Sequence, residues 1–298
     1  MPLIDVAPTI LWALAAVFGV LLVASAIVFV LIRAKPDRDF GELVLRVRSW
    51  WVMVAVFAIA IVLSPVTSLV FLGFVSFLAL KEFVSMVPTR RADRKVLFWA
   101  YLAIPLQYVW VGQEWYGMFI IFVPVYMFLL LPTLMVIRGE TTGFLKAAGT
   151  LHWGMMTCVF AISHAGYLLV LRGDTPAGGA GLLLFLVFLT QANDVAQYVW
   201  GRLFGRHKAA PTVSPNKTVE GYVGGFVTTG LLAVAIAPWL TPMDWPHALV
   251  GGLIIGFAGF MGDVTVSAVK RDIGVKDTGA LLPGHGGILD RIDSLTFT

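Results

Sequence analysis

Long apolar runs constrain the fold of this chain more than any other feature of its sequence. Hydrocarbon removes water from the backbone, so a chain crosses a bilayer only as helices or as a closed barrel. Unbroken runs favour helices, because the strands of a membrane barrel show short segments of alternating hydrophobicity. Charged residues make up 13% of the 298 residues, whereas soluble domains contain about 25%. We therefore expect an all-α, polytopic integral membrane protein with about nine transmembrane helices.

The apolar runs also give the approximate position of each transmembrane helix, since a crossing helix needs about 20 predominantly apolar residues. The first run is longer than the apolar region of a signal peptide and has no A-x-A-like site after it, so we interpret it as a retained span. The second, third and fourth runs are short, and the second and third could instead form a re-entrant pair. The expected spans are Thr9–Ile32, Trp50–Leu63, Val66–Leu80, Val96–Val111, Trp115–Ile137, Leu151–Leu171, Gly179–Tyr198, Tyr222–Leu240 and His247–Val266.

Basic residues in the connecting segments indicate how the chain is oriented. Basic connections stay in the cytoplasm. An even number of crossings must separate the first two basic segments, and a hairpin through Ser64-Pro65 provides it. We therefore expect the N-terminus outside and the C-terminus in the cytoplasm. All but one of the 21 Lys and Arg residues lie in segments 33–49, 81–95, 138–150 and 199–221 and in the C-terminal tail, the exception being Arg172.

The segment before the second span has a pattern of its own. Apolar residues recur at helical spacing from Phe40 to Trp51, with Glu42, Arg46 and Arg48 between them. This pattern is typical of an interfacial helix on an anionic leaflet, and it is equally compatible with a basic linker.

Polar residues collect at the expected cytoplasmic ends of the last three spans. We therefore divide the chain into an N-terminal transmembrane bundle, residues 1–178, and a C-terminal catalytic region, residues 179–298. The polar segments are TQANDVAQYVWGRLFGR (190–206), PTVSPNKTVEGYVGG (211–225) and GDVTVSAVKRDIGVKD (262–277), the last of which continues into LLPGHGGILDRID (281–293).

Carboxylates are the first candidate functional groups in these segments. Asp194 and Asp263 lie near the ends of apolar helices, where a charge is costly and is a functional candidate by default. Asp290 and Asp293 are spaced i, i+3, so a helix would point both the same way. Three of these acids, Asp263, Asp290 and Asp293, would repel one another if they met, unless a cation joined them. Oxygen ligands favour Mg²⁺, which also binds phosphate oxygens.

Basic residues and glycines beside the acids indicate a phosphate ligand. An arginine guanidinium can donate two hydrogen bonds to phosphate oxygens, and a lysine ammonium group provides a compact positive charge. Glycines let backbone N–H groups approach an anion closely, and a turn at Ser214-Pro215 could present a hydroxyl to the same anion. His285 could contact a phosphate or a metal-bound water, or it could do neither. The phosphate-binding candidates are Lys217, Lys270, Arg271, Lys276, Gly284, Gly286, Gly287 and Arg291.

This combination of residues is typical of phosphoryl or nucleotidyl transfer, in which the protein mainly positions groups and neutralises charge. The sequence contains no G-x-x-x-x-G-K-[ST] motif, so a P-loop NTPase is not expected.

The segment from Ser267 to Ser294, SAVKRDIGVKDTGALLPGHGGILDRIDS, resembles the signature of the phosphatidate cytidylyltransferase family, also called CDP-diglyceride synthetases. That pattern runs S-x-x-K-R-x-x-x-x-K-D and, after a short gap, H-G-G-x-x-D-R-x-D. The blocks GRLFGR and SPNKTVEGYVGG are similar to further parts of the family. Two details differ: Gln197 stands between Ala196 and Tyr198, and the chain stops soon after the signature, where family members continue with another apolar stretch.

The resemblance implies the transfer of CMP from CTP to phosphatidate, which yields CDP-diacylglycerol and pyrophosphate. It also implies Mg²⁺, with a second metal or a monovalent cation left open, and a homodimer in a bacterial inner (plasma) membrane with the active site facing the cytoplasm. Carried over to this chain, the metal ligands are Asp263, Asp290 and Asp293. The phosphate-binding residues are Ser214, Lys217, Lys270 and Arg271, and Asp194 lines the same polar cavity.

Other functions remain open at this stage. Related membrane kinases, which use CTP to phosphorylate a polyprenol or similar lipid alcohol, carry part of the polar pattern. A non-catalytic or transport paralogue could use the acids to bind ions, although transporters place such sites near the membrane midplane. We expect CTP, phosphatidate and membrane lipids as partners, and no nucleic acid.

Overall fold

The chain is helical along nearly its whole length in a computed structural model that describes residues 7–36, 38–90, 93–171, 176–279, 281, 284 and 286–298. Two short strands, β1 (Lys208–Ala210) and β2 (Ser214–Thr218), form an antiparallel hairpin. The helices are α1 (Pro8–Ala34), α2 (Gly41–Leu63), α3 (Pro65–Met86), α4 (Arg94–Gly112), α5 (Tyr116–Ile121), α6 (Phe128–Ile137), α7 (Phe144–Met155), α8 (Ile162–Tyr167), α9 (Gly178–Phe204), α10 (Val219–Leu240), α11 (Trp245–Asp272) and α12 (Leu289–Ile292).

Within the described residues, eight helical segments are long and apolar enough to cross a membrane. They are α1, α2, α3, α9, α10, α11 and two continuous rods, in which π-helical turns join α5 to α6 and α7 to α8. This confirms the prediction of an all-α polytopic membrane protein. The remaining expected span coincides with α4, which has 19 residues and is not among the eight.

The second and third spans are longer than their apolar runs suggest. α2 begins at Gly41, so residues 41–51 form the first turns of a spanning helix rather than a separate interfacial helix or a linker. The helix starts before the apolar run because its backbone hydrogen bonds do not depend on side-chain polarity, and long Arg side chains at a helix end can extend towards water. α2 and α3 have 23 and 22 residues, so both can cross and no re-entrant pair is required.

The hairpin between these two helices is at the expected place. Ser64 Oγ accepts a hydrogen bond from the Thr67 backbone N–H at 3.0 Å, and Pro65 opens α3. Serine at the N-cap and proline at the first helical position are both favourable at a helix start, so the local sequence sets the turn.

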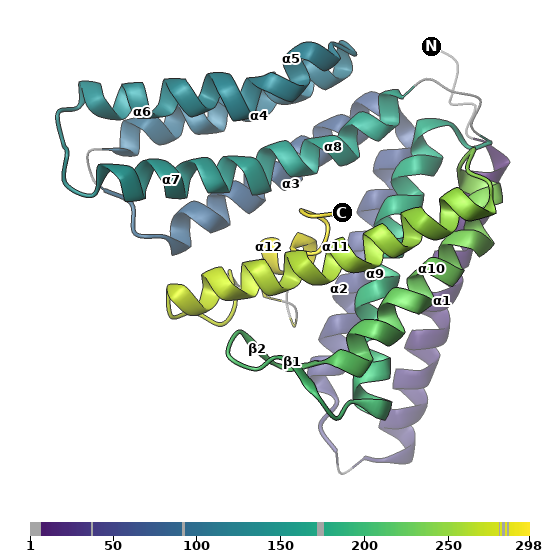
Figure 1. Ribbon diagram of the computed structural model, residues 1–298. Helices are drawn as coiled ribbons and strands as arrows, with labels where there is room; N and C mark the ends of the chain where they lie inside the picture. Colours follow the sequence, from purple (N-terminus) through teal and green to yellow (C-terminus); the bar gives the residue numbers. More distant parts are fainter. Residues whose placement is uncertain are drawn as a thin grey trace.

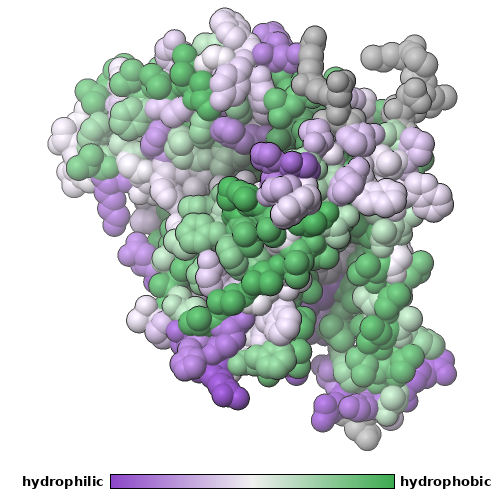
Figure 2. Space-filling view, turned by 45° about the vertical axis from the view of Figure 1, so that its right-hand side comes forward, coloured by the Kyte–Doolittle hydropathy of each residue, from purple (hydrophilic) through white to green (hydrophobic). Residues whose placement is uncertain are grey.

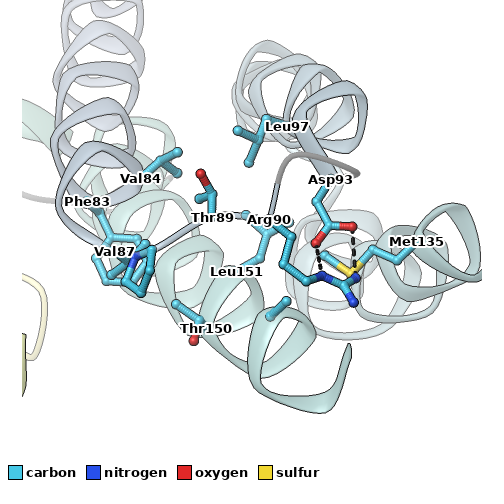
Figure 3. A pocket seen from close by; sticks show the side chains of 12 residues that line it. Phe83, Val84, Val87, Thr89, Arg90, Asp93, Leu97, Met135, Thr150 and Leu151 are labelled. Atoms are coloured by element: carbon cyan, nitrogen blue, oxygen red, sulfur yellow. Dashed lines mark hydrogen bonds and ion pairs between the residues drawn. The ribbon is translucent and has the colours of Figure 1, made fainter. Parts of the chain in front are cut away.

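A buried ion pair fixes the connection between α3 and α4 (Figure 3). Arg90 binds both carboxylate oxygens of Asp93, at 2.6 and 2.9 Å, and Asp93 is buried. The same guanidinium donates to the backbone oxygens of Glu140 and Thr142, at 3.0 and 2.9 Å. Arg90 therefore ties the α3–α4 connection to the α6–α7 connection, and it serves as a structural clamp.

The helices form two groups that lie at a steep angle to each other (Figure 1). In this view α3, α4, α6 and α7 run across the upper left, and α1, α2, α9 and α10 run down the right-hand side. α11 packs against α10 and α9 and extends from the second group towards the left. Arg172, the basic residue expected on the outer side, lies outside the described residues.

Small residues allow α9, α10 and α11 to pack closely. A methyl group added at Gly252 of α11 would lie 2.4 Å from the Ala233 side chain and 2.9 Å from the Thr229 backbone oxygen, both on α10. The fully buried Asn193 of α9 completes the junction: it donates to the Gly256 backbone oxygen at 3.3 Å and accepts from the Thr229 hydroxyl at 3.2 Å. Close backbone approach and interhelical hydrogen bonds are the usual basis of helix association in membranes.

The outer surface agrees with a membrane location. Figure 2 shows hydrophobic residues over much of one face and hydrophilic residues at its lower edge, including the region around the α1–α2 connection. Only 11% of the most apolar window of α1 is buried in the protein. A helix so apolar and so exposed requires an apolar solvent such as lipid.

We expect Gly252→Ala to lower the free energy of unfolding by about 1–3 kcal/mol, the usual cost of an extra methyl group in a filled interface. Gly251→Ala is the matched control, because a methyl group there meets only the Met243 sulfur, at 3.7 Å. Thermal unfolding of the two variants in detergent measures the difference. Equal midpoints would contradict the close packing of α10 and α11.

Candidate active site

A polar cavity of about 430 Å³ lies between α9, β2, α10 and α11. Four residues that the sequence singled out line it together, Asp194 from α9, Ser214 and Lys217 from β2, and Asp263 from α11. These residues come from three separate polar segments, so the fold assembles one site from them. The cavity is also lined by Gln197, Tyr198, Gly201, Arg202, Asn216, Thr218, Gly221 and Tyr222.

The hairpin carries Lys217 into this cavity. Pro211 to Val213 form the turn, so Ser214 and Pro215 begin the returning strand and do not make a turn themselves. The expected Ser-Pro turn is therefore wrong. The strand passes directly into α10, where the Thr218 hydroxyl caps the helix by accepting from the Gly221 N–H at 3.1 Å. This tight connection leaves little freedom for the residues just before it.

Lys217 and Asp263 form the central ion pair of the site. Lys217 Nζ lies 2.5 Å from Asp263 Oδ2 and 4.9 Å above the centre of the Phe260 ring. The other Asp263 oxygen accepts from the Ser267 hydroxyl at 3.2 Å. Both charged side chains are partly exposed, at 17% and 28%, so an entering anion can reach the ammonium group.

A third carboxylate belongs to this group. Asp293 is buried, and burial together with the nearby charges of Asp263 and Asp194 raises its pKa well above the ordinary value. Asp194 accepts from the Ser294 hydroxyl at 3.0 Å, which ties α9 to the end of the signature segment. We call Asp194, Asp263 and Asp293 the acid cluster.

Asp290 has different partners, although it lies only three residues before Asp293. One of its oxygens pairs with Lys270 Nζ at 2.8 Å. The other accepts from the Thr278 N–H, the Thr278 hydroxyl and the Gly287 N–H, at 2.8, 3.0 and 3.0 Å. Burial raises the pKa of Asp290, but Lys270 and the backbone donors together lower it by more than burial raises it, so the net shift is downward. Asp290 therefore binds Thr278 and Gly287, which precede α12, whereas Asp293 lies near Asp263 and Asp194.

The glycines of the signature segment allow this arrangement. Gly286 has a φ of +82°, and a methyl group on Gly287 would lie 2.2 Å from the Thr278 hydroxyl and 2.4 Å from Glu82 Oε2. The backbone approaches anions here, and the approach of these glycines to a phosphate stays a prediction. The anions are carboxylates of the protein itself.

The remaining predicted residues have different surroundings. Arg271 donates to the Val213 backbone oxygen at 3.2 Å and so anchors the hairpin turn. Lys276 is exposed. Arg291 is half-buried, and its Nε has no hydrogen-bond partner among the described residues. His285 lies outside the described residues.

Sequence reasoning missed two features of the site. Arg202 lines the cavity and donates to the Tyr198 hydroxyl at 2.8 Å, so a further cation stands at its rim. Glu82 reaches the signature segment from α3 and accepts from Ile288 and Leu289 N–H, both at 2.9 Å. The available signal for Glu82 was a single acid near the end of an apolar run, which could not reveal its distant partners.

The acid cluster offers the chemistry that a magnesium ion requires. Its ligands are oxygen atoms only, and two of the three carboxylates repel the buried third, so a divalent cation would relieve that repulsion. In the present arrangement, however, no group of three or more His, Cys, Asp or Glu side chains among the described residues is placed so that it could hold a metal ion.

Comparisons with known proteins identify the family of the chain. The sequence profile of the Cytidylyltransferase family matches residues 44–298. The uncharacterized protein YnbB of Escherichia coli (strain K12) is 46% identical over 286 residues, which cover 96% of this chain and 94% of that protein. The phosphatidate cytidylyltransferase of Staphylococcus haemolyticus (strain JCSC1435) is 28% identical over 85% of this chain and 95% of its own. The protein of the same name from Staphylococcus saprophyticus subsp. saprophyticus is 38% identical over 47% of this chain and 54% of its own.

Because the family profile covers most of the chain, and because the cavity gathers acids and bases from three segments of that match, the protein belongs to the cytidylyltransferase family and is a membrane nucleotidyltransferase.

Proposed function

We propose that the protein transfers CMP from CTP to phosphatidate and produces CDP-diacylglycerol and pyrophosphate. The observation that carries this proposal is the polar cavity, in which Lys217, Asp263 and Asp194 meet beside membrane-spanning helices. The names of the staphylococcal relatives give the same lipid substrate. A nucleotide reaching the cavity from water would meet a lipid phosphate there.

The chemistry requires little from the protein beyond placement and charge. An oxygen of the phosphatidate phosphate attacks the α-phosphorus of CTP, the bond from that phosphorus to the bridging oxygen breaks, and pyrophosphate leaves with the electron pair. The nucleophile is already an anion, so no strong general base is needed. What the reaction needs is screening of negative charge, which Lys217 and Arg202 supply within the cavity, with Lys270 and Arg271 nearby on α11.

We propose that the site also takes Mg²⁺. Asp263 and Asp293 would hold the ion, with Asp194 beside them, and Asp290 would join only if it released Lys270 or the loop. Bound Mg²⁺ would neutralise negative charge on the phosphates of the substrates. A second metal, a monovalent cation and the homodimer remain predictions from the family resemblance.

The fate of the CTP phosphates separates this proposal from its rival. With label in the α-phosphate, the purified protein in phosphatidate vesicles should transfer label to lipid and release unlabelled pyrophosphate. A CTP-dependent lipid kinase would transfer label only from the γ-phosphate. Label in lipid from the γ position alone would contradict the proposed reaction.

Asp263→Asn should reduce turnover by at least about a hundredfold. The neutral amide neither forms an ion pair with Lys217 nor holds a cation during the transfer of CMP. Asp272→Asn is the matched control on the same helix, since Asp272 is exposed at the last turn of α11. Its turnover should stay within about twofold of the parent, as expected for a surface substitution. Lipid-dependent pyrophosphate release measures both, and equal activities would remove Asp263 from the mechanism.

We propose further that the N-terminus lies outside and that the active site faces the cytoplasm of a bacterial inner membrane. These two conditions together require α4 to cross, in addition to the eight segments that are long and apolar enough among the described residues. The only cysteine, Cys158, is buried, so single introduced cysteines can report the topology. Gln113→Cys, after α4, should react with a membrane-impermeant maleimide in intact cells, and Thr89→Cys, before α4, only in opened membranes. Labelling of both positions from one side would show that α4 does not cross.

A further inference from the structure

Glu82 connects the N-terminal helices to the signature segment through hydrogen bonds. Glu82 Oε1 accepts from the Ile288 N–H at 2.9 Å, and Oε2 accepts from the Leu289 N–H at 2.9 Å. Oε2 also lies 3.2 Å from the Thr278 hydroxyl, whose single proton it shares with Asp290. These partners lie about two hundred positions away in the sequence, and the two backbone donors, Ile288 and Leu289, are the residues at which α12 begins. The carboxylate therefore fixes the start of that helix from outside the catalytic region.

The contact is specific for a carboxylate. The two backbone donors bind different oxygens, so a glutamine would present its NH₂ group to one of them whichever way its amide turned. One N–H would then lose its acceptor inside a half-buried site, which is costly. The surrounding glycines fit the same group: a methyl group on Gly279 would lie 3.0 Å from Glu82 Oε1, and one on Gly287 2.4 Å from Oε2.

The opposite end of the same segment meets α11. A methyl group on Gly262 would lie 2.5 Å from the Asp293 backbone oxygen. The short helix α12 is thus held at its start by Glu82 and closely approached at its end by α11. Asp293 follows Leu289 by about one helical turn, so a shift at the start of α12 displaces the Asp293 carboxylate relative to Asp263 and Asp194.

We propose that Glu82 is a positioning residue, which sets α12 so that the Asp293 carboxylate lies near Asp263 and Asp194. The expected loss of kcat rests on the proposed function. The expected anchoring of α12 rests on the hydrogen bonds alone. Glu82 does not touch the reacting groups. Its effect passes through the backbone of Ile288 and Leu289.

The test is Glu82→Gln in the full-length protein, with Glu140→Gln as the matched control. The Glu140 side chain is exposed, and among the described residues its carboxylate accepts a hydrogen bond from the Thr142 N–H alone, away from the signature segment. We expect Glu82→Gln to lower kcat and kcat/KM for CTP together by about tenfold or more, since small misplacements of catalytic groups are costly. Amide hydrogen exchange at Ile288 and Leu289 should become faster, while exchange in α9 and α10 stays unchanged. Glu140→Gln should change none of these.

Glu82→Asp provides a second variant if the glutamine protein does not fold. It keeps the charge but withdraws the carboxylate by one methylene group, so the same loss of kcat and the same faster exchange are expected. Unchanged exchange at Ile288 and Leu289 in a folded variant would overturn the anchor. Faster exchange with unchanged kcat would overturn the positioning role. If the parent protein makes no CDP-lipid, the proposed function fails, and the exchange result still decides the anchor.

Discussion

A charged side chain among apolar helices loses its hydration, and the structure depends on how each such charge is compensated. Asp263 is paired with Lys217, and Asp290 with Lys270. Asp293 has no pairing of this kind among the described residues, and its pKa is raised first by burial and then by the repulsion of Asp263 and Asp194. Asp263 and Asp290 are therefore each compensated by a lysine, whereas the buried Asp293 is not. Asp293 is where a cation or a cationic ligand has most to stabilise.

The helices could be predicted because their cause is local. Apolar runs located all the spanning segments, and Ser64-Pro65 marked a hairpin that its own side chains form. The start of α2 could not be found in this way, since the helix continues through Arg46 and Arg48 into a region that hydrophobicity treats as polar. The division of the chain at residue 178 remains a prediction.

The site could be predicted by residue type and only partly by arrangement. Asp194, Ser214, Lys217 and Asp263 line one cavity, but the sequence could not assign partners within the signature segment. Spacing suggested that Asp290 and Asp293 act together, whereas Thr278 and Gly287 give Asp290 a separate set of donors. Glu82 shows the limit most clearly, because its partners depend on how α3 packs against the last helix and no local pattern encodes that contact.

The close contact between Glu82 and Gly287 has a consequence for how related chains can diverge. A methyl group at position 287 and a carboxylate at position 82 compete for the same space. The same methyl group would lie 2.2 Å from the Thr278 hydroxyl and 2.8 Å from the Gly279 backbone nitrogen. A chain could therefore accept a larger residue at 287 only if positions 82 and 278 and the backbone at 279 changed as well, so these positions should vary together across homologues. Such covariation would record a tertiary contact between α3, which carries no family motif, and the signature segment.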